Sequence, residues 1–321
     1  MKFNSTKMML FSLISMTTLS SMSSNNILFT WMMMEINMIS FLPIMSTSNK
    51  MKDQIMKYFI MQSMASSIML MSILMCSVFE SPVSNSMMLM TSLLVKLGVM
   101  PMHIWMPPLM SSLSWETCMI LTTMQKITPT LMLTQTLMLN ITNLPMILSL
   151  ILAPVSAMKQ LSLKKIMSFS SISNTPWMYY SMMNSKTQYI MFMIIYSTIN
   201  IMLMNKFKQM NLQFINQMSI MSFKQKMNMI MMSISISGMP PMTGFLPKWI
   251  ILQSTISISI MISTAMISSS MISTFIYMKM IAPNMMMQST TKKTKKNKES
   301  MNFNMMVNIL GIPMMLVIKS M

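Results

Sequence analysis

Arginine is absent from this chain of 321 residues, and the residue types that build most catalytic and metal sites are scarce. The chain has one His, one Asp and two Cys, Cys76 and Cys118, both within apolar segments. So few ligands cannot complete a four-ligand zinc site or hold an iron–sulfur cluster. The four glycines build no phosphate-binding loop, and they stand at Gly98, Gly238, Gly244 and Gly311. We therefore expect that the chain itself binds no cofactor or metal.

Charge is also scarce, because charged residues make up 9% of the chain and hydrophobic residues 53%. Apolar stretches long enough to cross a membrane recur along the sequence. A soluble helical bundle would show polar faces at helical spacing, whereas residues 27–45 are apolar all round apart from one Glu and a few small polar groups. This pattern indicates an all-α, polytopic membrane protein. We expect about 11 spans of roughly 17–25 residues, near 8–22, 27–45, 55–78, 86–107, 116–138, 144–158, 166–182, 187–205, 227–252, 256–280 and 303–318.

The net charge of +18 would ordinarily suggest a nucleic-acid partner. Between the expected spans, however, nearly every lysine falls on one side of the membrane, and only Lys186 and Lys319 fall on the other. This asymmetry is the positive-inside pattern. It predicts a lipid bilayer environment, no nucleic-acid binding, and an N-terminus on the inner, matrix-like side.

Methionine supplies 61 residues, while all 23 basic residues are Lys. Adaptable packing explains single methionines but not their use at most apolar positions. Codon usage explains the bias better, since AT-rich animal mitochondrial genes read AUA as Met and do not read AGR as Arg. The N-terminal stretch lacks Arg and runs into apolar sequence, so we expect a first span there and no transit peptide. The predicted location is the mitochondrial inner membrane.

Four ionisable residues lie inside the predicted spans: Glu35, Lys96, Lys126 and Lys248. A charge within hydrocarbon is costly, so such residues mark ion or proton pathways. A snorkelling lysine needs a span end within reach, and Lys126 has none. The four residues therefore point to proton or ion translocation.

Two spans are interrupted in a comparable way, at residues 96–108 and 238–249, where Gly and Pro cluster beside a Lys. Proline breaks or kinks a helix, and broken backbone at membrane depth must be buried in protein or line a wet cavity. The alternative interpretation is that both are ordinary proline kinks in a helical bundle. The presence of a lysine at each break argues against it. The pattern is typical of inverted-repeat transporters. We expect two inverted five-helix repeats at 1–138 and 144–282, a basic matrix-side loop at 283–302 and a C-terminal helix at 303–321.

Several motifs carry a resemblance to a known family over essentially the full length. They are WMMMEIN at 31–37, KYF at 57–59, KLG at 96–98, PMHIW at 101–105, QKITP at 125–129, KKIMSFSSI at 164–172 and GMPPMTGFLPKW at 238–249. The sequence resembles the chain 2 family of NADH-ubiquinone oxidoreductase, the antiporter-like, proton-pumping subunits of respiratory complex I. The last motif is the most specific.

The resemblance implies roles for particular residues. Glu35 would pair with Lys96, Lys126 would be the central proton carrier, and Lys248 would be the terminal or exit site. His103 would be a relay near neutral pH, or equally a hydrogen-bonded structural ring at the helix break. The chain would act within an H⁺-translocating NADH:ubiquinone reductase whose FMN, iron–sulfur clusters and ubiquinone lie in other subunits. Its partners would be other membrane-arm subunits of complex I.

Some residues depart from the family pattern. Met124 stands where a Trp is usual, Lys164 replaces an Arg, Asn174 aligns with a His and Pro176 with a Gly. Asn does not exchange a proton near neutral pH, so water would have to fill any relay role there. Lys292 to Lys298 form either a solvated loop or a site for anionic lipid such as cardiolipin. The competing functions are a free-standing cation/proton antiporter and a purely structural assembly subunit.

Overall fold

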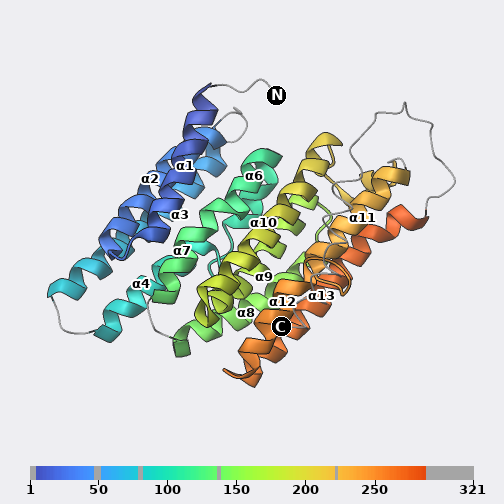
Figure 1. Ribbon diagram of the computed structural model, residues 1–321. Coiled ribbons are helices and arrows are strands. Elements are labelled where there is room, and N and C mark those ends of the chain that lie inside the picture. The colour runs from blue at the N-terminus through green and yellow to red at the C-terminus, as the bar shows by residue number, and fades with distance from the viewer. Residues whose placement is uncertain (1–4, 47–51, 79–81, 136–138, 221–222, 287–321) are drawn as a thin grey trace. The chain divides into compact units, whose positions relative to one another are not determined.

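The computed structural model describes residues 5–46, 52–78, 82–135, 139–220 and 223–286, and its helices confirm the all-α fold class (Figure 1). The elements are α1 (Ser5–Ser23), α2 (Ile27–Met45), α3 (Lys52–Val78), α4 (Pro82–Leu97), α5 (Met106–Ser112), α6 (Trp115–Thr122), α7 (Met124–Gln135), α8 (Leu139–Met158), α9 (Leu163–Asn184), α10 (Lys186–Gln209), the 3₁₀ helix η2 (Ile215–Ile220), α11 (Phe223–Ser237), α12 (Phe245–Ile256) and α13 (Ile260–Met286).

The first ten predicted spans each correspond to a helix or to a pair of shorter helices. Within the described residues, five helices are long and apolar enough to cross a membrane alone, namely α2, α3, α8, α10 and α13. The interrupted spans divide into α4 with α5, α6 with α7, and α11 with α12, whose pieces are each shorter than a bilayer requires. The predicted span at 303–318 and the run Lys292 to Lys298 lie outside the described residues.

Many Ser and Thr side chains lie within these apolar helices. Their hydroxyls donate back to the carbonyl three residues earlier, as Ser72 does to Met69 at 2.6 Å and Ser149 to Met146 at 2.8 Å. This bond satisfies the hydroxyl inside the helix. A serine-rich helix can therefore remain buried or face lipid without an unpaired polar group.

The chain divides into two compact units at Ser149 and Leu150, a boundary that falls inside α8. In the first unit, α2 packs against α1, α3 and α7, while α4 packs against α3 and α7. In the second unit, α10 packs against α9, α11 and α12, and α13 packs against α9, α11, α12 and η2. The inverted-repeat relation between 1–138 and 144–282 stays a prediction.

Large apolar side chains are exposed on helices of both units. Met16 in α1 is 71% exposed and Met271 in α13 is 66% exposed, among many others. Contiguous apolar surface of this kind is unusual for a soluble monomer. Faces of this composition suit contact with lipid or with neighbouring membrane subunits.

Proline does not break every helix that contains it. The α9 helix continues through Pro176, which cannot donate a backbone hydrogen bond to the carbonyl of Ile172. The hydroxyl of Thr175 donates to that carbonyl at 2.6 Å. A neighbouring side chain thus replaces the lost bond, as is common for proline within membrane helices.

Candidate functional site

Glu35 and Lys96 form an ion pair in the first unit. Glu35 lies in the middle of α2 and Lys96 in the last turn of α4, and Nζ of Lys96 donates to Oε1 of Glu35 at 3.4 Å. The side chain of Lys96 is 6% exposed and that of Glu35 is 21% exposed. The end of α4 also presents the negative pole of the helix dipole to the ammonium group. The pairing expected from the sequence is therefore confirmed.

The α4 helix ends directly after this lysine. Gly98 has a left-handed φ of 66°, which glycine adopts without steric cost. A Cβ atom at Gly98 would come within 3.2 Å of the Trp105 indole ring, and the indole Nε1 donates to the carbonyl of Val95 at 3.1 Å. The predicted break is thus present, and Trp105 closes the helix end by satisfying one of its carbonyls.

Lys126 lies in the first turn of α7, after a further interruption of the same unit. The preceding helix, α6, ends at Thr122, and Thr123 has φ −113° and ψ −78°. Only 3% of Lys126 is exposed. A snorkelling lysine would carry its ammonium group out to water, so this alternative does not fit the structure. Lys126 is an interior lysine of the first unit.

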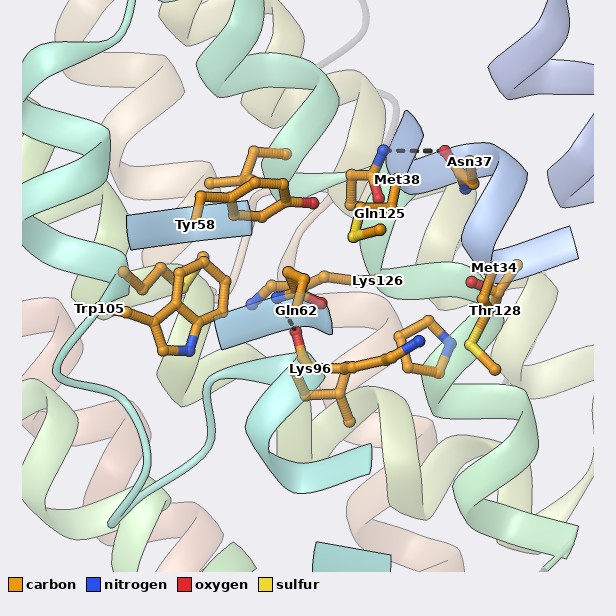
Figure 2. A pocket seen from close by; sticks show the side chains of 14 residues that line it. Met34, Asn37, Met38, Tyr58, Gln62, Lys96, Trp105, Gln125, Lys126 and Thr128 are labelled. Carbon is orange, nitrogen blue, oxygen red and sulfur yellow. Dashed lines mark hydrogen bonds between the residues drawn. The ribbon is translucent and has the colours of Figure 1, made fainter. Parts of the chain in front are cut away.

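Lys96 and Lys126 line the same cavity, whose empty volume of about 490 Å³ includes space that is open to the outside (Figure 2). In Figure 2 both lysine side chains lie near the centre of the view with Gln62, while Tyr58 and Trp105 lie at one side. The remaining polar lining is neutral and comes from Asn37, Gln125 and Thr128.

Hydrogen bonds hold the neutral side chains of the cavity in place. Nε2 of Gln125 donates to Oδ1 of Asn37 at 2.8 Å, and Nε2 of Gln62 donates to the backbone carbonyl of Lys96 at 3.4 Å. Tyr58 is 3% exposed, and its ring lies 5.8 Å from the Trp105 indole. A roomy cavity with several polar partners can hold ordered water, which is the medium that proton transfer between separated side chains requires.

His103 lies in the non-helical segment between α4 and α5. Its Nδ1 atom is 3.2 Å from the carbonyl oxygen of Pro101, and the residue does not line the cavity of Lys96 and Lys126. The imidazole thus lies at the helix break, and its contact with a backbone carbonyl fits the structural role that the sequence left open. The relay role stays a prediction.

Lys248 occupies the corresponding break of the second unit. The α11 helix ends at Ser237, Gly238 has φ 79°, and Lys248 lies in the first turn of α12. Its Nζ atom donates to the carbonyls of Ser237 at 2.9 Å and Ile236 at 3.4 Å. The ammonium group also lies 5.5 Å from the ring centroid of Trp177, within cation–π range. Lys248 is 7% exposed, so this site is as enclosed as that of Lys96.

The sequence reading did not find the interruption between α6 and α7. Residues 116–138 were expected to form one span, because no glycine or run of prolines marks a break there. Pro129 was no direct signal, because α7 continues through it and the bond that it lacks is to Gln125, which lies inside α7 and after the interruption at Thr123. Asn37 and Gln62 were also missed as cavity residues, since isolated amides in apolar helices carry no distinctive pattern.

Among the described residues, no group of three or more His, Cys, Asp or Glu side chains is arranged to hold a metal ion. The described cavities are lined by lysines, neutral polar groups and apolar side chains, and the carboxylate of Glu35 bonds to one of these lysines. This is a set suited to accepting and releasing protons.

The chain is also similar in sequence to known proteins. Residues 24–276 match the family model described as NADH:quinone oxidoreductase/Mrp antiporter, TM. A protein of Locusta migratoria named NADH-ubiquinone oxidoreductase chain 2 is 37% identical, over 79% of this chain and 77% of the relative. The Anopheles gambiae protein of the same name is 32% identical, over 74% of this chain and 73% of the relative.

The fold is also similar to a solved structure. A chain of respiratory complex I from Thermus thermophilus with bound aureothin superposes with a TM-score of 0.77 at 13% identity, covering 98% of this chain and 78% of that one. At this identity the likeness concerns the fold alone.

Proposed function

The chain belongs to the NADH-ubiquinone oxidoreductase chain 2 family, and we propose that it is a membrane subunit of respiratory complex I that translocates protons across the mitochondrial inner membrane. The observation that carries this proposal is the Lys96–Glu35 ion pair beside a polar cavity that Lys126 also lines. Electron transfer from NADH to ubiquinone, with its FMN and iron–sulfur clusters, takes place in other subunits. The partners of this chain are membrane-arm subunits of the same complex.

Lys126 is the central proton carrier in this proposal. It shares a cavity with Lys96, and two positive charges close together disfavour one another. While Glu35 pairs with Lys96, the positive charge of Lys96 is largely compensated. When the pair separates, the uncompensated charge of Lys96 favours release of the proton from Lys126. Movement of one carboxylate thereby controls proton release from a lysine on another helix.

Lys248 is the terminal proton site of the second unit. It is deeply enclosed and bonded to backbone carbonyls, so it holds a positive charge without a carboxylate. His103 remains a candidate relay, and its contact with the Pro101 carbonyl equally fits a structural role at the helix break. Anionic lipid such as cardiolipin would bind the basic matrix-side loop at 283–302.

The N-terminus lies on the matrix side in this proposal, and α10 offers a direct test because its two ends should face opposite sides. Lys206 and Lys208 lie in its last turn, which fits the matrix side. In a background with Cys76 and Cys118 replaced by Ser, Gln209→Cys should react with an impermeant thiol reagent only from the matrix side. Lys186→Cys, at the other end of the same helix, should react only from the intermembrane side. The reverse pattern would contradict the orientation.

The complex I assignment is tested by purification from native membranes under mild detergent. Flavin and iron–sulfur absorbance that migrates with this chain in a single large particle is expected. A particle that contains this chain and lacks both chromophores would instead support a free-standing cation/proton antiporter, whose membrane subunits fall under the same family description.

A further inference from the structure

The second unit contains buried polar groups that the proposed function has not used. Tyr196 and Asn200 lie one helical turn apart on α10 and are 8% and 2% exposed. Among the described residues, the hydroxyl of Tyr196 and the side-chain oxygen of Asn200 have no hydrogen-bond partner. Buried polar groups in native proteins are almost always satisfied, so this pair requires a physical explanation.

The unsatisfied groups face one another and a third amide. The Tyr196 hydroxyl lies near the side chains of Asn200 and of Asn174 on α9, yet it reaches neither in hydrogen-bonding geometry. Polar groups that face each other across more than direct bonding distance are commonly bridged by water. The arrangement is therefore suited to a shared water molecule.

There is space for such a water next to Lys248. A cavity whose empty volume of about 280 Å³ includes space open to the outside is lined by Asn174, Tyr196, Lys248 and Ser235, together with apolar side chains. An ammonium group has three N–H donors, and two of those on Lys248 are directed at the carbonyls of Ile236 and Ser237. A water molecule bound between these groups would have several polar partners, as a buried water requires.

We propose that Asn174, Tyr196 and Asn200 form a water-binding site that receives the proton of Lys248. This inference rests on the proposed function, since it supplies the next step after the terminal lysine. An N–H bond of Lys248 breaks and an O–H bond forms on the bound water. That water passes a proton to the Tyr196 oxygen while the phenol releases its own proton to a second water, so Tyr196 is neutral before and after the transfer. The two asparagines exchange no proton and act as positioning residues.

Tyr196→Phe is the most direct test, because it removes only the hydroxyl oxygen. The ring would keep its stacking on Phe192, at a centroid distance of 5.9 Å and an interplanar angle of 13°. The assembled complex carrying this variant is reconstituted in vesicles, and protons moved per electron are measured across a range of pH values. We expect normal assembly, at least a twofold loss in proton yield, and a changed pH profile. Tyr189→Phe is the matched control, since Tyr189 is a buried tyrosine of the same helix that does not line the cavity.

A second variant separates a proton role from a packing role. Asn174→His places an exchangeable group in the same cavity, so Tyr196→Phe combined with Asn174→His should recover proton yield relative to Tyr196→Phe alone. A wild-type pH profile and proton yield in Tyr196→Phe would overturn the water-site proposal. If Lys126→Ala abolished pumping in the same assay, the proposed function would stand while this inference failed. If pumping survived both changes, the proposed function itself would fail.

Discussion

The two broken helices bury a lysine in the same way but satisfy its charge by different means. In the first unit, Lys96 lies in the last turn of α4 and pairs with the carboxylate of Glu35 at 3.4 Å. In the second unit, Lys248 lies in the first turn of α12 and donates to the backbone carbonyls at the end of α11. Residues 150–286 contain no Asp or Glu at all. One lysine thus has a side-chain carboxylate as its counter-charge, and the other has backbone carbonyls and the face of the Trp177 ring.

This difference indicates in which unit a side-chain movement can change the electric field at the buried lysine. A carboxylate on a side chain can rotate away from its partner and change the local field by a full charge, while carbonyls at a helix end stay where the fold holds them. The first unit also has the more polar cavity, with the side chains of Asn37, Gln62, Gln125 and Thr128 beside its two lysines. We therefore assign the control of proton binding to the first unit, and a constant terminal site to the second.

The largest effect is expected when Glu35 alone is neutralised. Glu35→Gln leaves the 6% exposed Lys96 without its counter-charge, and breaking a buried pair costs about 3 kcal/mol at the lower end of the known range. Lys96→Met should also lower stability, because it leaves the carboxylate of Glu35 unpaired in the middle of α2. The measurement is the fraction of the chain retained in the assembled complex after mild heating.

The double variant Glu35→Gln with Lys96→Met serves as the control for that experiment. Replacing both members of a buried pair is often far milder for folding than removing one. The double variant should therefore assemble better than Glu35→Gln alone and still pump poorly, since the movable charge is gone. Assembly and pumping that fell together in all three variants would mean that the pair has only a structural role.

A smaller effect is expected from Gly238→Ala. A non-glycine residue at its φ of 79° costs about 1–2 kcal/mol, and the new Cβ would lie 2.8 Å from Cδ of Lys248. The lysine must then shift away from its carbonyls, so both assembly and proton yield should fall. Gly98→Ala carries a similar backbone cost, but its Cβ meets the Trp105 ring at 3.2 Å and leaves the Lys96–Glu35 pair untouched. We expect it to weaken assembly and to preserve the proton yield of the complexes that form. Equal proton yields in the two variants would contradict the distinction between the sites.

Much of this architecture follows from local sequence. Membrane-length apolar stretches predicted the helices, and the Gly and Pro clusters predicted where α4 and α11 end, because left-handed backbone and lost hydrogen bonds are properties of those residues themselves. The pairing of Glu35 with Lys96 was expected only from the family resemblance, because the two residues lie far apart in the sequence and their charges alone do not identify a partner. The helices and their breaks, in contrast, follow from the chemistry of single residues and their neighbours along the chain.

Other features depend on how distant segments pack. The carbonyls that hold Lys248 belong to Ile236 and Ser237, and no side-chain pattern identifies a carbonyl as a ligand. Likewise, Gln62 and Asn37 become cavity residues only because α2, α3 and α4 pack together with α7. The interruption at Thr123 has no proline at it, whereas α7 continues through Pro129 and α9 through Pro176, the latter with help from Thr175. A proline alone therefore does not determine whether a helix stops.

The central claim, that Lys126 carries the translocated proton, is tested most directly by Lys126→Ala in the assembled complex. Alanine removes the only part of the side chain that binds a proton and leaves the helix and the cavity in place. Protons moved per electron are measured in sealed vesicles, with Lys186→Ala, an exposed lysine of α10, as the control. We expect the Lys126→Ala complex to assemble and to show clearly lowered proton translocation, while the control matches the unmodified protein. Unchanged proton-to-electron stoichiometry and turnover in Lys126→Ala would contradict the account.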